Sequence, residues 1–224
     1  MTVLDIFNAL YTCYGKQHWW PADSPFEVMV GAILTQNTSW SNVEKAIGNL
    51  KSQNLLDPDI LSRMDQNKLG GYITSAGYFN LKAKRLINFC KWYTSCGGYE
   101  ALNKQGTGQL RQALLSVNGV GEETADDMLL YAFARPVFVI DAYTRRIFSR
   151  IGLVNGEETY QDLRVHFEES LKNHIKQASE QVDTFNEYHA LIVLHAKNIC
   201  QKSPRCESCC ISRQCLRKGL NDTQ

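Results

Sequence analysis

Four cysteines near the end of the sequence have a spacing suited to metal ligation. Five of the eight cysteines fall within sixteen residues, and Cys200-x5-Cys206-x2-Cys209-x5-Cys215 would bring four thiolates into one compact loop. In a chain with no export signal, such crowding favours metal ligation over disulfide bonds. Zinc sites with four cysteines usually pair two C-x2-C units, and only one is present, so the spacing favours a [4Fe-4S] cluster while zinc stays an alternative.

A second candidate site is the glycine-containing stretch VNGVGEETA, residues 117–125. Asn118 and Gly119 can take the left-handed conformation that ends a helix, and Gly121 allows a second close backbone approach. The backbone N–H groups of residues 119–121 and the positive end of the next helix could then bind a phosphate without a charged side chain. A plain corner between two helices is the competing interpretation, because G-x-G alone is a weak signal.

Three carboxylates accompany this stretch and the segment that follows it. Glu122 and Glu123 begin the helix after the hairpin, where acids complement the helix dipole. Asp141 follows the apolar run VFVI, residues 137–140, and precedes another helical pattern, a position typical of an N-cap. The same position would hold a carboxylate rigidly at the edge of a cleft, so the N-cap and catalytic interpretations are compatible.

The elements that must position these residues are helices. Apolar residues recur at helical spacing in five segments, and alternation typical of strands is scarce. The segments are FEVMVGAIL (26–34), SNVEKAIGNL (41–50), LKAKRLINFCKWY (81–93), TGQLRQALLSV (107–117) and residues 182–199. The sequence therefore predicts an all-α chain. It has no flexible linker, so any division into lobes must come from packing.

Composition sets broad limits on function. With 224 residues, 44% hydrophobic and 21% charged, the chain can form one large core or two modest ones of an ordinary globular protein. No apolar run reaches the length of a membrane span, and the N-terminus lacks a signal peptide's basic region, so we expect an intracellular, cytoplasmic protein. Net charge is only +1, yet residues 197–218 hold six basic side chains and one acid, a patch that could meet phosphate.

Taken in order along the chain, these segments resemble the helix-hairpin-helix DNA glycosylases of the endonuclease III superfamily. The resemblance covers nearly the whole chain, and its five pieces are SPFEVMVGAILTQNTSWSNVEKA, YITSAGYFNLKAKRL, VNGVGEETA, VFVIDAYTRRIFSRIG and YHALIVLHAKNICQKSPRCESCCISRQC. It implies two helical lobes. Residues 23–136 would form a six-helix barrel with the hairpin at 118–121, and residues 1–22 with 137–224 a [4Fe-4S] cluster lobe with its loop at 200–215.

The resemblance also implies a partner, double-stranded DNA containing a damaged base, bound in the groove between the lobes with the target nucleotide flipped out. We expect a monomer without membrane association. Gln36 matches the residue that fills the gap left by the flipped base. The hairpin residues implied in DNA binding are Asn118, Gly119, Val120 and Gly121.

The resemblance assigns the catalytic carboxylate and the cluster ligands. Asp141 would assist departure of the base by stabilising positive charge on the sugar and by orienting or deprotonating a water. The [4Fe-4S] ligands would be Cys200, Cys206, Cys209 and Cys215. The first cysteine interval is five residues instead of the family's usual six, so Cys210 competes with Cys209 as third ligand. The rest of the spacing fits as it stands, and we favour Cys209.

Glu123 departs from the family pattern in an informative way. Bifunctional members have a lysine at this place, whose amine attacks the sugar carbon and leads to strand cleavage. A glutamate cannot form an imine. The sequence therefore predicts a monofunctional glycosylase that uses water, with Asp141 and Glu123 in its active site and without efficient AP-lyase activity.

Three tryptophans indicate the substrate. Trp19, Trp20 and Trp40 lie in polar, loop-like settings, and aromatic faces hold a flipped base well, a cationic one best. With Glu123, these segments most resemble the endonuclease III-type 3-methyladenine DNA glycosylases, although typical members of that group lack the cluster. We therefore expect an alkylated purine such as 3-methyladenine as the excised base.

Three alternatives stay open. One is a monofunctional glycosylase for mismatched or oxidised bases. Another is a non-catalytic iron–sulfur protein that binds DNA, and the third is a helical module held together by zinc. The scattered cysteines, Cys13, Cys90 and Cys96, are expected to be small buried residues. No role is assigned to the histidines on helical segments, which are His166, His174, His189 and His195.

Overall fold

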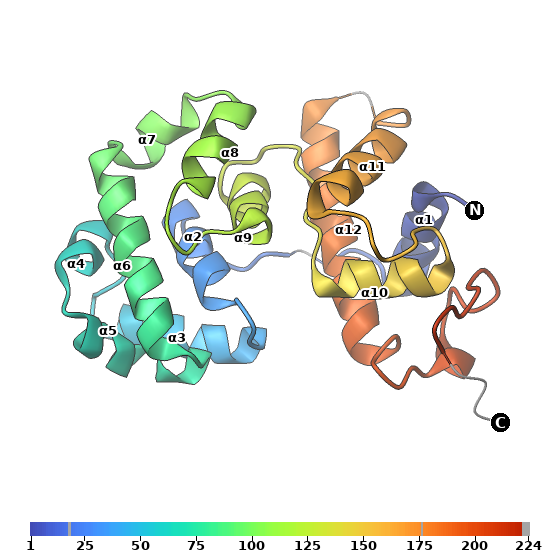
Figure 1. Cartoon of the computed structure of the whole chain (residues 1–224), viewed down its shortest axis with the longest axis horizontal. Coiled ribbons are helices and arrows are strands. Elements are labelled where there is room, and N and C mark those ends of the chain that lie inside the picture. Colours follow the sequence, from blue (N-terminus) through green and yellow to red (C-terminus); the bar gives the residue numbers. More distant parts are fainter. Residues whose placement is uncertain (18, 176, 221–224) are drawn as a thin grey trace. The chain divides into compact units, whose positions relative to one another are not determined.

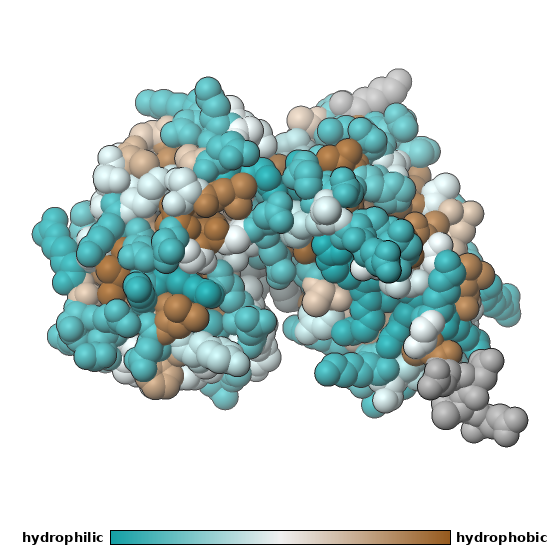
Figure 2. Space-filling view, viewed as in Figure 1, coloured by the Kyte–Doolittle hydropathy of each residue, from teal (hydrophilic) through white to brown (hydrophobic). Residues whose placement is uncertain are grey.

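The computed structural model describes residues 1–17, 19–175 and 177–220. Every regular element within these ranges is a helix, which confirms the all-α prediction. None of these helices is long and apolar enough to cross a membrane. Figure 2 shows one face of the molecule, on which hydrophilic residues predominate and hydrophobic residues form small separate groups.

The chain divides into two compact units (Figure 1). One unit consists of Met1–Trp19 together with Arg135–Gln224, and the other of Trp20–Ala134. Because the first unit is made of both ends of the chain, the second is inserted into it as one continuous segment.

The unit Trp20–Ala134 is built around α2 (Pro25–Leu34). This helix begins at the N-cap Ser24, whose hydroxyl accepts a hydrogen bond from the backbone N–H of Glu27, and nine of its ten residues are buried. It packs against α3, α6 and α9 and a π-helical segment (Figure 1). The elements of the unit are α3 (Trp40–Ser52), α4 (Pro58–Arg63), α5 (Gln66–Tyr72), α6 (Phe79–Ser95), α7 (Gly98–Asn103), α8 (Thr107–Leu115), α9 (Glu122–Asp127), a 3-10 turn at Thr74–Ala76 and the π-helical segment Met128–Ala132.

A buried lysine fixes the end of α2. Lys82 of α6 is 1% exposed, and its Nζ donates to the carbonyl oxygens of Leu34 at 2.9 Å and Ala76 at 2.7 Å. Burial, together with the positive charge of Arg85, lowers the pKa of Lys82 to about 8. These bonds hold the residue just before Thr35 and Gln36, so they position the loop that follows α2.

The π-helical segment continues α9 with a wider turn. The backbone N–H of Phe133 donates to the carbonyl of Met128, five residues earlier, at 3.1 Å. Tyr131 in this segment packs against Trp20, with ring centroids 4.9 Å apart. A π turn rotates the residues after it relative to a regular α-helix, and such turns occur often near functional sites.

The unit of Met1–Trp19 and Arg135–Gln224 has an aromatic core around α12. Its helices are α1 (Val3–Tyr14), α10 (Ala142–Ile151), α11 (Tyr160–Lys172) and α12 (Ala178–Asn198), followed by a 3-10 turn at Cys206–Ser208. Phe138 packs on Phe167 at 4.8 Å and on Phe185 at 5.4 Å between ring centroids. The buried Tyr188 hydroxyl donates to the carbonyl of Val3 at 2.6 Å, which fastens α1 to α12.

Some local expectations need correction. Trp40 is the first residue of α3 and not part of a loop, and the helix before the hairpin ends at Leu115. The buried run 137–140 belongs to no regular element, and the backbone N–H of Phe138 donates to the Glu168 carboxylate at 3.1 Å. Of the scattered cysteines, Cys90 is buried as expected, whereas Cys13 is exposed and Cys96 half-buried.

Candidate functional site

The hairpin between α8 and α9 is held by a buried ion pair. Arg111 of α8 donates from Nε to Asp126 Oδ1 at 2.7 Å and from Nη2 to Oδ2 at 3.0 Å. Asp126 is fully buried on α9, so this two-point contact fixes the angle between the two helices. Glu122 approaches the same guanidinium at 3.7 Å, which gives this first-turn acid a structural partner.

Only one of the two residues expected to be left-handed adopts that conformation. Gly119 has φ +103°, whereas the φ of Asn118 is not positive. Gly121 is extended, with φ −94° and ψ −178°, and is the N-cap of α9. Val120 is buried, and a Cβ added at Gly121 would meet nothing within 4 Å, so the backbone there is open to a ligand.

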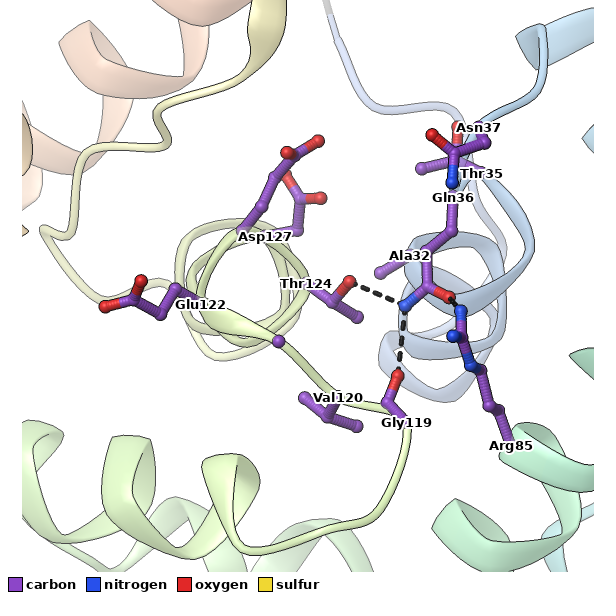
Figure 3. A pocket seen from close by; sticks show the side chains of 12 residues that line it. Ala32, Thr35, Gln36, Asn37, Arg85, Gly119, Val120, Glu122, Thr124 and Asp127 are labelled. Atoms are coloured by element: carbon purple, nitrogen blue, oxygen red, sulfur yellow. Dashed lines mark hydrogen bonds between the residues drawn. The ribbon is translucent and has the colours of Figure 1, made fainter. Parts of the chain in front are cut away.

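A chain of hydrogen bonds joins Gln36 to the hairpin (Figure 3). The Gln36 Nε2 donates to the carbonyl of Gly119 at 3.1 Å and to the hydroxyl of Thr124 at 2.9 Å, and its Oε1 accepts from the Arg85 guanidinium. The stem of Arg85 packs directly on Gly119, where an added Cβ would lie 2.3 Å from Arg85 Cγ. Glycine is therefore required at 119 by backbone conformation and by space.

A cavity of about 460 Å³ lies beside this chain of bonds. Its lining includes Glu122, Glu123 and Asp127 of α9. In Figure 3, Glu122 and Asp127 lie on one side and Gln36, Asn37 and Arg85 on the other. Glu123 is exposed, whereas Asp127 is only 4% exposed. Sequence reasoning missed Asp127, although it follows Glu123 by four residues and so shares its helix face. It missed Arg85 as well, because nothing local links it to Gln36.

Two of the three predicted base-pocket tryptophans lie together. Trp20 and Trp40 contact each other edge to face, with ring centroids 4.8 Å apart, and both rings approach Gly31 of α2. The Trp40 Nε1 donates to Glu44 at 2.9 Å. Neither ring is among the residues lining the cavity, and Trp19 belongs to the other unit. Their role as a base platform stays a prediction.

Asp141 is the N-cap of α10, as predicted. Its Oδ1 accepts from the Thr144 backbone N–H at 2.6 Å and from the Thr144 hydroxyl at 2.8 Å. Its Oδ2 lies 3.5 Å from His189 Nε2, and both side chains are buried. Burial acts to raise the pKa of Asp141, but the close contact with His189, the charge of His189 and the hydrogen bonds from Thr144 outweigh it, so the pKa lies below its ordinary value.

The cysteine loop surrounds a small apolar cavity after the end of α12. Cys200, Cys206, Cys209 and Cys215 all line it, together with Ile147, Ile151 and Ile211. Arg150 donates to Cys200 Sγ at 3.3 Å, and the backbone N–H of Arg217 donates to Cys215 Sγ at 3.4 Å.

The fifth thiol of this segment, Cys210, does not line the cavity. Cys210 is exposed and shares a groove with Cys13 on α1. Among the described side chains, no three His, Cys, Asp or Glu residues converge closely enough for a single metal ion. Four thiols around one apolar cavity, two of them with N–H donors, suit a multi-atom cluster with thiolate ligands.

Comparison with known proteins agrees with this architecture. Residues 30–173 match the family model of the HhH-GPD superfamily base excision DNA repair proteins. A Methanocaldococcus jannaschii protein, whose name provisionally assigns it as a DNA repair glycosylase, is 47% identical over 219 residues, 96% of each chain. Endonuclease III of Escherichia coli is 28% identical over 203 residues, 89% of this chain and 87% of that one.

Solved structures extend the agreement to the fold. The 3-methyladenine DNA glycosylase of H. pylori, bound to 1,N6-ethenoadenine, has a TM-score of 0.78 and 26% identity, covering 88% of this chain and 98% of that one. An endonuclease III–DNA complex has a TM-score of 0.77 and 20% identity, covering 96% and 95%. The chain therefore belongs to the HhH-GPD superfamily of base excision DNA repair proteins, as a helix-hairpin-helix DNA glycosylase.

Proposed function

We propose that this protein is a monofunctional DNA glycosylase that hydrolyses the N-glycosidic bond of an alkylated purine, such as 3-methyladenine, in double-stranded DNA. The observation that carries the proposal is Glu123, an exposed carboxylate on the wall of the hairpin cavity, where a strand-cleaving lyase needs an amine. The structural likeness to a 3-methyladenine DNA glycosylase supports the same substrate class.

The absence of a lyase step is supported by the state of Lys82. Its ammonium group is buried and donates to two backbone carbonyls, so it cannot reach a sugar carbon without breaking the end of α2. No lysine is among the residues that line the described cavity. With no amine on this wall to form an imine, the lining supports attack on the sugar by water.

The charge of the cavity favours a cationic base. The residues that line the described cavity include three carboxylates, Glu122, Glu123 and Asp127, and the cation Arg85, whose guanidinium donates to Gln36. Arg111 lies 3.7 Å from Glu122 and offsets part of its charge. Purines alkylated on a ring nitrogen are positively charged and are good leaving groups, so they need selection more than protonation. Carboxylates in a partly enclosed cavity attract such a base more strongly than a neutral one.

Asp141 is suited to the chemical step because it is rigid and held ionised. As the C1′–N bond breaks, its electron pair leaves with the base and positive charge develops on the sugar. A nearby carboxylate stabilises this charge. The water oxygen then bonds to C1′, and Asp141 accepts the proton that the water loses.

We assign DNA binding to the hairpin and cluster binding to the cysteine loop. Gly119, Val120 and Gly121 would contact a phosphate through their backbone, helped by the positive end of α9. The [4Fe-4S] ligands would be Cys200, Cys206, Cys209 and Cys215, because these four line one cavity and Cys210 does not. Such a cluster cross-links the residues that ligate it.

The colour of the purified protein tests which cysteine is the third ligand, because an iron–sulfur cluster is brown. We expect brown protein from Cys210→Ala but colourless protein from Cys209→Ala. Loss of colour in Cys210→Ala alone would reverse the assignment.

The substrate is tested by mass spectrometry of the bases released from methylated duplex DNA. We expect free alkylpurine from the wild type, strand breaks only after alkali, and at least a hundredfold slower release by Asp141→Asn, as for loss of a group that stabilises transition-state charge. Release of oxidised pyrimidine without alkylpurine would support the alternative substrate class. Equal release by Asp141→Asn, or no release from any lesion, would support a non-catalytic DNA-binding protein.

The absence of a covalent enzyme–DNA intermediate has its own test. Borohydride traps an imine between enzyme and DNA, so we expect no trapped complex. A trapped complex, or strand cleavage without alkali, would show lyase activity and refute the monofunctional assignment.

We also propose that the protein is a monomer. Gel filtration with light scattering should then show one chain per particle.

A further inference from the structure

Asp141 is held from two sides by different helices. Both donors to Oδ1 come from Thr144, one turn along α10, and form part of the N-cap. The other oxygen faces His189, which lies forty-eight positions later in the sequence, on α12. An N-cap needs one oxygen only, so the His189 contact is not explained by the start of α10.

We propose that His189 is a positioning residue for base release, which keeps the Asp141 carboxylate ionised and turned to one fixed orientation. This inference rests on the proposed function of Asp141. His189 does not need to touch the DNA or transfer a proton. It acts by placing an N–H donor, and positive charge when protonated, against the oxygen that Thr144 leaves unused.

The burial of the pair explains why such a partner is needed. Asp141 is 8% exposed and His189 is 6% exposed. A carboxylate removed from water tends to take up a proton, and a protonated Asp141 could neither stabilise a cationic sugar nor accept a proton from water. A neighbouring imidazolium opposes this tendency, because opposite charges at this distance favour each other's charged forms.

Other charged and titratable groups near this pair face elsewhere. On α10, Arg145 donates to the carbonyl of Glu158 at 2.8 Å, and Arg146 donates to the carbonyls of Cys200 at 2.9 Å and Ala196 at 3.1 Å. On α12, the Glu187 carboxylate accepts from the backbone of Gln17 at 2.5 Å.

The remaining neighbour is Tyr160 at the start of α11, whose hydroxyl accepts from the backbone N–H of Ile140 at 3.4 Å. Among the interactions described for α10, α11 and α12, His189 is therefore the basic side chain that contacts the Asp141 carboxylate.

The pH profile of base release tests this role. Single-turnover rates on methylated duplex DNA are measured from pH 4.5 to 9 for the wild type, His189→Gln and His189→Leu. Glutamine can still donate a hydrogen bond but carries no charge, so we expect the acid limb of the His189→Gln profile to move up by about 1 pH unit or more. Its rate on the plateau should stay within about fivefold of wild type, whereas His189→Leu should lose rate at every pH.

A matched control is His166→Gln, at an exposed histidine on α11 in the same unit. Its profile should follow that of the wild type. Circular dichroism and binding to a duplex with an abasic-site analogue identify any variant that is misfolded. If His189→Gln is misfolded, His189→Asn takes its place in the profile.

The outcomes separate this inference from the proposed function. A uniformly lower profile for His189→Gln with an unmoved acid limb means a purely structural histidine, and an unchanged profile means no role; either overturns the inference. If the wild type releases no base, or Asp141→Asn releases base as fast as wild type, the proposed function itself fails. An acid limb that moves only when His189 changes supports both.

Discussion

Replacing Gly119 with alanine tests how the hairpin is held. Gly119 has φ +103°, and its new Cβ would lie 2.3 Å from Cγ and 2.8 Å from Cβ of Arg85. The positive φ costs about 1–2 kcal/mol for a residue with a Cβ. The overlap involves the base of the Arg85 stem, which cannot swing aside as a flexible tip would, so Arg85 must withdraw from Gln36. Loss of a hydrogen bond from a charged donor costs about 1.5–3 kcal/mol.

These contributions are offset by about 0.4–1 kcal/mol, because alanine lowers the entropy of the unfolded chain. The free energy of unfolding should therefore fall by about 2–4 kcal/mol, measured by urea denaturation. Gly121→Ala is the matched control, two residues away in the same hairpin. Its φ is −94° and an added Cβ meets nothing within 4 Å, so its stability should stay within about 1 kcal/mol of wild type.

The Arg85→Ala background separates the two causes. Arg85→Ala removes Cγ and the guanidinium but keeps Cβ at 2.8 Å, so the Gly119→Ala cost should shrink but stay above the backbone contribution, since interacting neighbours are non-additive. Equal destabilisation by Gly119→Ala and Gly121→Ala, or an unchanged Gly119→Ala cost without Arg85, would refute the close contact as the reason for glycine at this position.

Two other carboxylates on α9 give separable predictions. Asp126→Ala should lower the free energy of unfolding by about 3–5 kcal/mol in urea, because it leaves the buried Arg111 guanidinium without its two-point partner; a loss below about 1 kcal/mol would contradict this. Asp127→Asn should slow release of cationic alkylpurines about tenfold, the effect of roughly 1.4 kcal/mol of lost attraction, with little effect on release of a neutral damaged base. Glu100→Gln, at an exposed carboxylate of the same unit, is the control, and equal slowing of both bases by Asp127→Asn would argue against charge selection.

Local signals in the sequence were sufficient for the helices with a clear apolar pattern and for the start of α10. The apolar run 26–34 predicted α2, and the position of Asp141 before a helical pattern predicted its N-cap. Both depend on neighbours within one or two turns. The acids at the start of α9 were equally readable, since the dipole at a helix start favours them.

Contacts between distant segments could not be predicted in the same way. Arg85 and Gln36 are forty-nine positions apart, and nothing near either residue indicates the other. His189 stood in an apolar helical pattern, where a histidine is most simply interpreted as a core residue. Trp40 was misplaced because its polar neighbours resemble a loop, although serine residues before an aromatic position are equally compatible with a helix start.

The π turn after α9 lets one continuous helix contact two separate groups of residues, the hairpin before it and the Trp20 cluster after it. Up to Asp127 the rotation of the helix is set by the hairpin and by the Arg111–Asp126 pair. From Met128 onward it is set by the packing of Tyr131 on Trp20. One additional residue in a turn rotates everything after it by about 100°. Evolution could therefore exchange the acidic residues facing the cavity without realigning the aromatic cluster, and could remodel the aromatic cluster without displacing the hairpin.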